Sequence, residues 1–212
     1  RILSLSSLFP PTYSIMSAVK KGATKCMDES YSGDGAWMNL GYKDVNMDAK
    51  TREANLKNLF DKLIANPDDH INVLAKDEPY KQDCQRLATT MYDSTMKNKN
   101  AAGPVLDVGC GYASQSLLFH DKFPKCQYTG INIGQAQVEA GQKRVAGLAG
   151  VEIKQASATD LSDFEPNHFS NVFALECAFH FDPRTVFLEE AMKVLQPGGK
   201  LAMMDIIGHK PL

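Results

Sequence analysis

The sequence predicts an α/β fold in which helices cover both faces of a parallel sheet. After residue 103, short apolar runs alternate with amphipathic stretches, and repeated strand–helix units of this kind place their strands parallel in one sheet. The first of these runs ends in a glycine-rich turn that leads into a helical pattern. The 212 residues, 43% of them hydrophobic, suffice for one such domain with additions.

The predicted strands are short, and a turn or a helix follows each. We expect strands over 104–108, 127–132, 151–155, 171–176 and 200–206, and helices over 113–122, 135–146 and 184–195. A Pro-Gly-Gly sequence at 197–199 ends the last of these helices. Because ligands of such sheets bind outside the carboxyl ends of the strands, we expect the functional residues at that edge.

Two further helices are predicted before the sheet. Residues 48–65 and 78–97 carry apolar side chains at helical spacing, and a polar linker joins them to the first strand. The chain is therefore divided into a helical cap or lid over 26–100 and a sheet domain over 101–212. Residues 1–25 are expected to be poorly ordered.

The N-terminal stretch is Ser-rich and weakly apolar, which is loosely typical of a targeting peptide. Two prolines, Pro10 and Pro11, interrupt it, and the chain starts at Arg1. We favour the simpler interpretation that Met16 is the natural start and that the preceding residues are upstream sequence.

The composition argues against several classes of protein. A net charge of −2 favours neither nucleic acid nor an anionic membrane as a partner. No apolar run approaches the roughly 20 residues that a bilayer-spanning helix needs. The five cysteines have no paired short spacing, which argues against a disulfide framework and against a metal site. The chain is expected in the reducing cytoplasm, and a homodimer is compatible with it.

The most informative stretch is Pro104–Ser116, PVLDVGCGYASQS. An apolar run ends in Asp107, and a turn with two glycines then leads into a helix. Glycine lets a backbone turn sharply and approach a ligand closely, and the first N–H groups of the helix can face that ligand. Three interpretations are open: a methyltransferase turn, a dinucleotide-binding turn, or a tight turn that binds nothing. The dinucleotide fingerprint fits less well, because Ser114 stands at its third glycine position.

The order of motifs along the chain resembles class I S-adenosylmethionine-dependent methyltransferases of the small-molecule type, and the resemblance covers about residues 31–211. The turn is similar to motif I of that family, which reads acid-x-Gly-x-Gly-x-Gly. The matching residues are Asp107, Gly109, Gly111 and Ala113. Ala113 departs from the pattern, because the family has its third glycine there.

The resemblance implies a Rossmann-like fold and S-adenosylmethionine as cofactor, with S-adenosylhomocysteine as product. In GINIGQAQ, it assigns Asn132, Ile133 and Gln137 to the cofactor's ribose and adenosine. Many members carry an acid where Asn132 stands, and an acid there would also favour NAD. In QASATDL, Ser157 replaces the family's acid near the adenine, and Ala158 keeps the small residue.

The stretch NVFALECAFHFDP resembles methyltransferases that act on sugar hydroxyls, sterols, tocopherol precursors and phthiotriol-type lipids. By this resemblance Glu176 contacts the methionine part of the cofactor. His180 is the expected base for an acceptor hydroxyl, since imidazole titrates near neutral pH. Asp205, at the end of the last predicted strand, is expected to orient His180 or to bind the acceptor. A capping or packing role is the alternative for His180.

The N-terminal sequence YSGDGAWMNLGYKD is similar to the family's entry segment, which assigns Tyr31 and Tyr42 to a lid over the cofactor. The family fold also adds a helix and two strands that this sequence lacks. The predicted function is methyl transfer to a partly apolar small-molecule acceptor at O, C or N. An inactive methyltransferase-like binding or regulatory protein is the alternative, and a nicotinamide oxidoreductase is a third.

Overall fold

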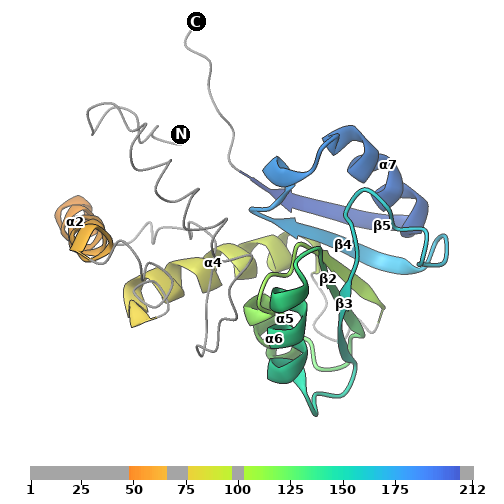
Figure 1. The fold of residues 1–212 in the computed structure, drawn as a ribbon, viewed down its shortest axis with the longest axis horizontal. Coiled ribbons are helices and arrows are strands. Elements are labelled where there is room, and N and C mark those ends of the chain that lie inside the picture. Colours follow the sequence, from red (N-terminus) through yellow and green to blue (C-terminus); the bar gives the residue numbers. More distant parts are fainter. Residues whose placement is uncertain (1–47, 66–75, 97–102, 206–212) are drawn as a thin grey trace, which may run out of the picture.

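The computed structural model describes residues 48–65, 76–96 and 103–205 of the chain. Its sheet is parallel throughout, with the order β3-β2-β1-β4-β5 (Figure 1). The strands are β1 (Val105–Val108), β2 (Tyr128–Asn132), β3 (Val151–Gln155), β4 (Phe169–Leu175) and β5 (Leu195–Met204). This arrangement confirms the predicted α/β fold with its parallel sheet.

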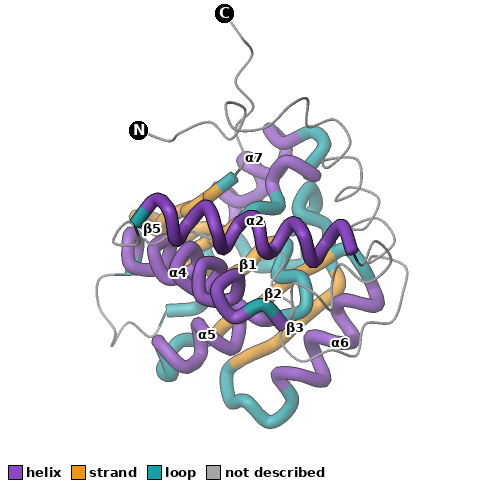
Figure 2. Tube along the Cα trace, turned by 90° about the vertical axis from the view of Figure 1, so that its left-hand side faces the viewer, coloured by secondary structure: helices purple, strands orange, loops and turns teal. Residues whose placement is uncertain are grey.

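Helices cover both faces of the sheet. Figures 1 and 2 show α7 on one side of the sheet and α5 and α6 on the other. The helices are α2 (Ala49–Ala65), α4 (Glu78–Thr95), α5 (Ser114–Lys122), α6 (Gln135–Val145) and α7 (Arg184–Val194), with a short 3-10 helix, η2 (Ala178–His180). Within the described ranges, no helix is long and apolar enough to cross a membrane.

The two faces of β1 and β4 each have a core of their own. Alternate residues point to opposite faces, so Val105 and Phe173 pack with the aromatic residues of α4 and α5, while Leu106 and Val172 pack with α7. The sequences of β1 and β4 are therefore nearly continuous apolar runs, as expected for a parallel sheet that is buried on both faces.

Helix α4 belongs to the core of the sheet. It begins at the N-cap Asp77, whose side chain accepts a hydrogen bond from the Tyr80 backbone N–H at 3.1 Å. Its fully buried Tyr92 packs edge-on against Phe119 of α5, with ring centroids 5.2 Å apart. The division into a cap over 26–100 and a sheet domain over 101–212 stays a prediction.

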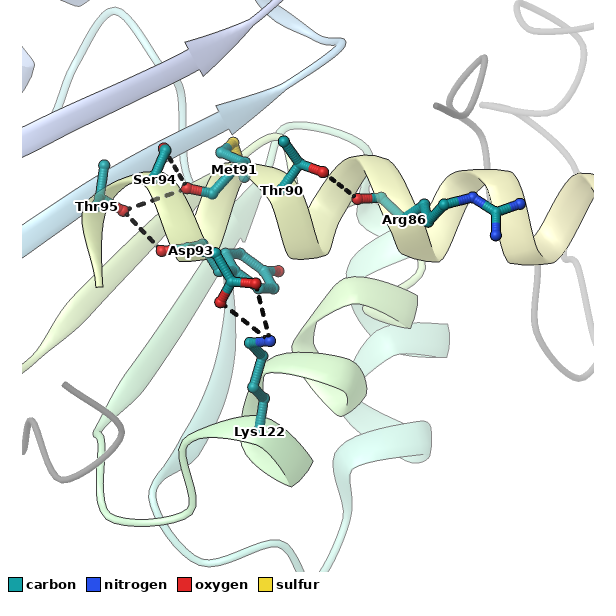
Figure 3. Close-up of polar contacts among 8 residues, drawn as sticks. Arg86, Thr90, Met91, Asp93, Ser94, Thr95 and Lys122 are labelled. Atoms are coloured by element: carbon teal, nitrogen blue, oxygen red, sulfur yellow. Dashed lines mark hydrogen bonds and ion pairs between the residues drawn. The ribbon is translucent and has the colours of Figure 1, made fainter. Parts of the chain in front are cut away.

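Polar contacts attach the C-terminal half of α4 to its neighbours. Lys122 of α5 forms an ion pair with Asp93 of α4 at 3.0 Å (Figure 3). Lys200 of β5 donates from Nζ to the carbonyl of Thr95 at 3.0 Å. Exposed ion pairs contribute about 0–1 kcal/mol each, so the buried aromatic contacts hold most of this interface.

Two of the predicted strands have other bounds in the structure. Strand β5 begins at Leu195, five residues before the predicted start, and includes the Pro-Gly-Gly sequence. Its pairing shifts register between Phe169 and Asn171, which accommodates that turn-like sequence within the ladder. Strand β4 begins at Phe169 and ends at Leu175, one residue before Glu176.

Candidate functional site

The carboxyl ends of the five strands form one continuous edge. The backbone N–H of Gly109, after β1, donates to Ile131 of β2 at 2.8 Å, and Ala156, after β3, donates to Asn132 of β2 at 3.1 Å. On the other side, Glu176, after β4, donates its backbone N–H to Met204 of β5 at 2.7 Å. The predicted site residues on these strands therefore share an edge, as the parallel order requires.

The glycine turn has an open side and a closed side. Gly109 has a φ of 78°, and a Cβ there would lie 2.7 Å from the Cβ and Sγ of Cys177. Gly111 has a φ of 56°, and a Cβ there would meet no described atom within 4 Å. The turn therefore packs against Cys177 at Gly109 and leaves space at Gly111, next to the N-terminus of α5.

Asp107 is fully buried beneath this turn. Its Oδ2 accepts hydrogen bonds from the side chains of Gln115 and Tyr128, while its Oδ1 has no partner among the described residues. Burial raises the pKa of the Asp107 carboxyl to about 6, although the hydrogen bonds from Tyr128 and Gln115 lower it. The carboxylate keeps one unused acceptor, and a ligand's donor would satisfy it.

The residues assigned to the ribose and adenosine lie after β2. Asn132 ends β2 and donates from its amide to Oε1 of Gln137 on α6. Gln137 is buried, so its side chain does not lie on the solvent-exposed face of α6. Ile133 is 65% exposed, and its carbonyl accepts a hydrogen bond from Gln155 at 3.1 Å.

The residues after β3 form a local turn. The hydroxyl of Ser157 lies 2.9 Å from that of Thr159 and accepts a hydrogen bond from the Thr159 backbone N–H. Both Ser157 and Ala158 are half-buried. Ser157 is thus engaged in a local turn, and the structure places Ala158 in the same turn.

Acidic side chains gather around Cys177, the first residue after Glu176. Burial raises the pKa of the Cys177 thiol well above its usual range, and the negative charges of Asp107, Asp205 and Glu176 raise it further. The thiol donates to the carbonyl of Val108 at 3.0 Å. The acidic edge between β1, β4 and β5 thus carries three carboxyl groups that act on one thiol, and a cationic ligand would complement them.

Glu176 and Asp205 both lie one residue beyond their strands. Glu176 has a left-handed φ of 48°, so the chain turns sharply after β4 instead of continuing as the predicted strand. Asp205 follows Met204, and its carboxylate lies 3.5 Å from the guanidinium of Arg184, with a side chain only 6% exposed. Arg184 also donates from Nε to the carbonyl of Ala178 at 3.0 Å.

His180 ends η2, close to the start of α7. Its side chain is exposed, which argues against the packing alternative. Its ring centroid lies 4.1 Å from that of Phe179, which is 42% exposed. Because Arg184 contacts both η2 and Asp205, it links the turn that carries His180 to the end of β5. The two residues that the resemblance assigns to a lid, Tyr31 and Tyr42, lie outside the described residues.

The sequence reasoning did not find four polar residues of this site: Gln115, Tyr128, Arg144 and Arg184. A buried carboxylate needs donors, so Asp107 itself indicated that such partners exist. Their identity depends on which faces of α5, β2, α6 and α7 meet the edge, and no local motif records that.

Comparisons with known proteins agree with the geometry. Residues 106–203 match the family model described as a methyltransferase domain. Erythromycin 3''-O-methyltransferase of Saccharopolyspora erythraea is 32% identical over 136 residues, which are 60% of this chain and 44% of that protein. The phthiotriol/phenolphthiotriol dimycocerosates methyltransferase of Mycobacterium leprae is 33% identical over 136 residues, 62% of this chain and 47% of that protein. The chain thus spans about half the length of these curated relatives.

Solved structures show the same fold. The [4+2]-cyclase SpnF superimposes with a TM-score of 0.61 at 20% identity, covering 88% of this chain and 59% of that one. Geranyl diphosphate methyltransferase, solved with GPP and sinefungin, gives a TM-score of 0.60 at 19% identity, covering 81% of this chain and 57% of that one. Residues 106–203 are thus similar in sequence and in fold to class I S-adenosylmethionine-dependent methyltransferases of the small-molecule type.

The residues present fit the cofactor of that class, S-adenosylmethionine. Gly111 leaves space beside the first N–H groups of α5, and Asp107 Oδ1 is a buried acceptor without a partner among the described residues. Asn132 and Gln137 place amide groups at the end of β2, where hydroxyl groups can bond to them. A cofactor with cationic groups also suits the acidic edge around Cys177.

Proposed function

We propose that this protein transfers the methyl group of S-adenosylmethionine to a partly apolar small-molecule acceptor that carries a hydroxyl. The observation that carries the proposal is the open turn at Gly111 above the half-satisfied carboxylate of Asp107. A turn that bound nothing would have no need for a buried acceptor without a donor, because such a group costs about 1–3 kcal/mol.

The acidic edge explains how the chain would hold a cation. The negative charges of Asp107, Asp205 and Glu176 all raise the pKa of the partly buried Cys177 thiol, so all three carboxylates act at this one position. Bound S-adenosylmethionine supplies an activated methyl group on a sulfonium. The carboxylates stabilise positive charge at this edge, and the protein's remaining task is to align the acceptor with that methyl group.

An acceptor hydroxyl must lose its proton as the methyl group arrives. We assign the proton transfer to an imidazole nitrogen of His180, which is exposed on η2 beside the acidic edge. Arg184 pairs with Asp205, so we assign Asp205 to holding this edge together with Arg184 and to binding the acceptor. The orientation of His180 by Asp205 stays a prediction.

The apolar character of the acceptor is supported by the surface near His180 and by the relatives. Phe179 is 42% exposed and Ile133 65% exposed, and both follow strands at the carboxyl edge. The relatives are named as methyltransferases of erythromycin, of phthiotriol dimycocerosates and of a fatty acid. These names support a hydroxyl or carboxyl oxygen on a bulky, partly apolar molecule.

Calorimetric titration with S-adenosylmethionine tests the cofactor, with NAD as the control ligand. Binding of S-adenosylmethionine alone is expected, and binding of NAD alone would overturn the proposal. Release of S-adenosylhomocysteine is then measured across macrolide glycosides, sterols, quinol precursors, fatty acids and amines.

The base is tested with His180→Ala on the acceptor that reacts best. We expect turnover to fall about 10²–10⁴-fold while cofactor affinity is kept. His120→Ala, on α5 away from the strand ends, is the matched control. Unchanged turnover of His180→Ala would remove the assigned role.

We also propose a cytoplasmic location, since Cys84, Cys110, Cys126 and Cys177 are thiols in the structure. Fractionation of cells that express the full-length protein tests this location. A homodimer is the assembly we would test first, by sedimentation equilibrium.

A further inference from the structure

We propose that Arg144 holds the glycine turn in its ligand-accepting shape and so compensates for the missing third glycine at Ala113. The turn departs at this position from motif I of the class I methyltransferases that the chain resembles. The proposal rests on the proposed function only in naming S-adenosylmethionine as the ligand of the turn.

The turn contains three left-handed residues at alternate positions. Gly109, Gly111 and Ala113 have φ values of 78°, 56° and 62°. Glycine adopts this region readily, but the Cβ of alanine crowds the backbone there. Ala113 is also fully buried, so its conformation is imposed by its surroundings and must be stabilised by contacts elsewhere.

Arg144 supplies such contacts on both sides of Ala113. Its Nη1 donates to the carbonyl of Tyr112 at 2.9 Å and to the hydroxyl of Ser114 at 2.9 Å. The guanidinium is charged, so these hydrogen bonds are stronger than neutral ones. The two residues that flank the strained position are therefore fixed by one side chain from a different strand–helix unit.

Helix α6 lies directly against the turn at this point. A Cβ on Gly141 would lie 3.3 Å from the Cβ of Ala113, so the absence of a side chain there permits the close approach. Arg144 is three residues further along α6, which places it on the same face of the helix. Gly141 thus brings α6 to the turn, and Arg144 binds the turn's backbone.

The two hydrogen bonds from Arg144 to the turn predict a specific pattern of cofactor affinities. Arg144→Gln is expected to raise the Kd for S-adenosylmethionine about tenfold, because it removes charge-assisted hydrogen bonds. The Kd of Arg144→Lys is expected to lie between those of the wild type and of Arg144→Gln, since lysine keeps the charge but lacks the several N–H donors of a guanidinium. Lys143→Gln, an exposed neighbour on α6, is the matched control and is expected to bind as the wild type does.

The decisive experiment asks whether a glycine at position 113 restores the affinity that Arg144→Gln loses. If Arg144 offsets the strain at Ala113, the double variant Arg144→Gln with Ala113→Gly should recover an affinity within about threefold of the wild type. A merely structural arginine would not be rescued by a glycine at this one position. Thermal unfolding of each variant identifies any that fails to fold, in which case Arg144→Lys with and without Ala113→Gly replaces that pair.

A readout without ligand keeps this proposal separate from the proposed function. Amide hydrogen exchange of 112–114 should be faster in Arg144→Gln than in the wild type, with β4 unchanged as the internal control. Unchanged exchange, wild-type affinity of Arg144→Gln, or failure of Ala113→Gly to rescue would each overturn the inference. If the wild type itself does not bind S-adenosylmethionine, the proposed function fails. The exchange measurement still shows whether Arg144 holds the turn.

Discussion

Tyr128 donates its hydroxyl to Oδ2 of Asp107 inside the core, one strand away from the glycine turn. The phenol and Gln115 both bond this oxygen, so the other oxygen of Asp107 is the one that stays available to a ligand. The contact orients the carboxylate but does not offset its burial, because the pKa of Asp107 rises to about 6. Ligand binding and stability are therefore opposed at this residue.

Asp107→Asn is expected to stabilise the ligand-free protein at neutral pH. The folded-state pKa of about 6 exceeds the ordinary 3.8, so the contribution of Asp107 to stability is complete below 3.8 and is lost as the pH rises through 6. The loss amounts to about 3 kcal/mol at most. Asparagine does not titrate, so the variant should unfold at higher denaturant concentration at pH 7.5 and show a weaker pH slope between 4 and 6.

Calorimetry provides the second half of this prediction. The same variant should bind S-adenosylmethionine at least tenfold more weakly, because a cation at this site favours the ionised carboxylate. For the wild type, affinity should increase as the pH rises from 5 to 7. Asp121→Asn, at an exposed position of α5, is the control for stability and binding. A variant of Asp107 that is less stable and binds normally would contradict both halves.

Gly111→Ala and Gly109→Ala should separate binding from folding. At Gly111 the added methyl group meets no described atom, so stability should fall by only about 1–2 kcal/mol from the left-handed φ. The methyl group would nevertheless fill the open side of the turn, and S-adenosylmethionine binding should be lost. At Gly109 the methyl group collides with Cys177, so unfolding by urea should show a larger loss of stability. Wild-type affinity in Gly111→Ala would exclude this space as the cofactor cradle.

Arg184 and Asp205 should be energetically coupled. In a double-mutant cycle with Arg184→Gln and Asp205→Asn, we expect a coupling free energy of unfolding of about 1 kcal/mol, because the Asp205 side chain is nearly buried while the Arg184 side chain is 43% exposed. The exposed pair Lys57–Asp61 on α2 serves as the comparison, with coupling below about 0.5 kcal/mol. Equal coupling in the two pairs would contradict the role of Arg184 in linking η2 to β5.

The elements of the sheet domain could be predicted closely from the sequence. Strand periodicity and turn residues placed β1, β2, β3 and the helices α5 and α6 within one or two residues. The start of β5 could not be predicted, because Pro-Gly-Gly is a turn signal in isolation, whereas pairing with β4 draws the chain into the ladder from Leu195. The turn after Leu175 was missed for a similar reason, since a left-handed φ at Glu176 has no local signal.

The sequence by itself predicted the class of protein that this chain resembles, because glycine spacing, strand-end acids and the order of motifs are local properties of the chain. It also predicted that these residues would lie along one edge of the sheet, since parallel strands share one carboxyl edge. Only the tertiary structure decided what each residue contacts there. Asp107 receives hydrogen bonds from Gln115 and Tyr128, Asp205 faces Arg184, and Arg144 holds the turn around Ala113. The physical reason is that such partners depend on helix packing and burial between residues distant in sequence, which no short motif encodes.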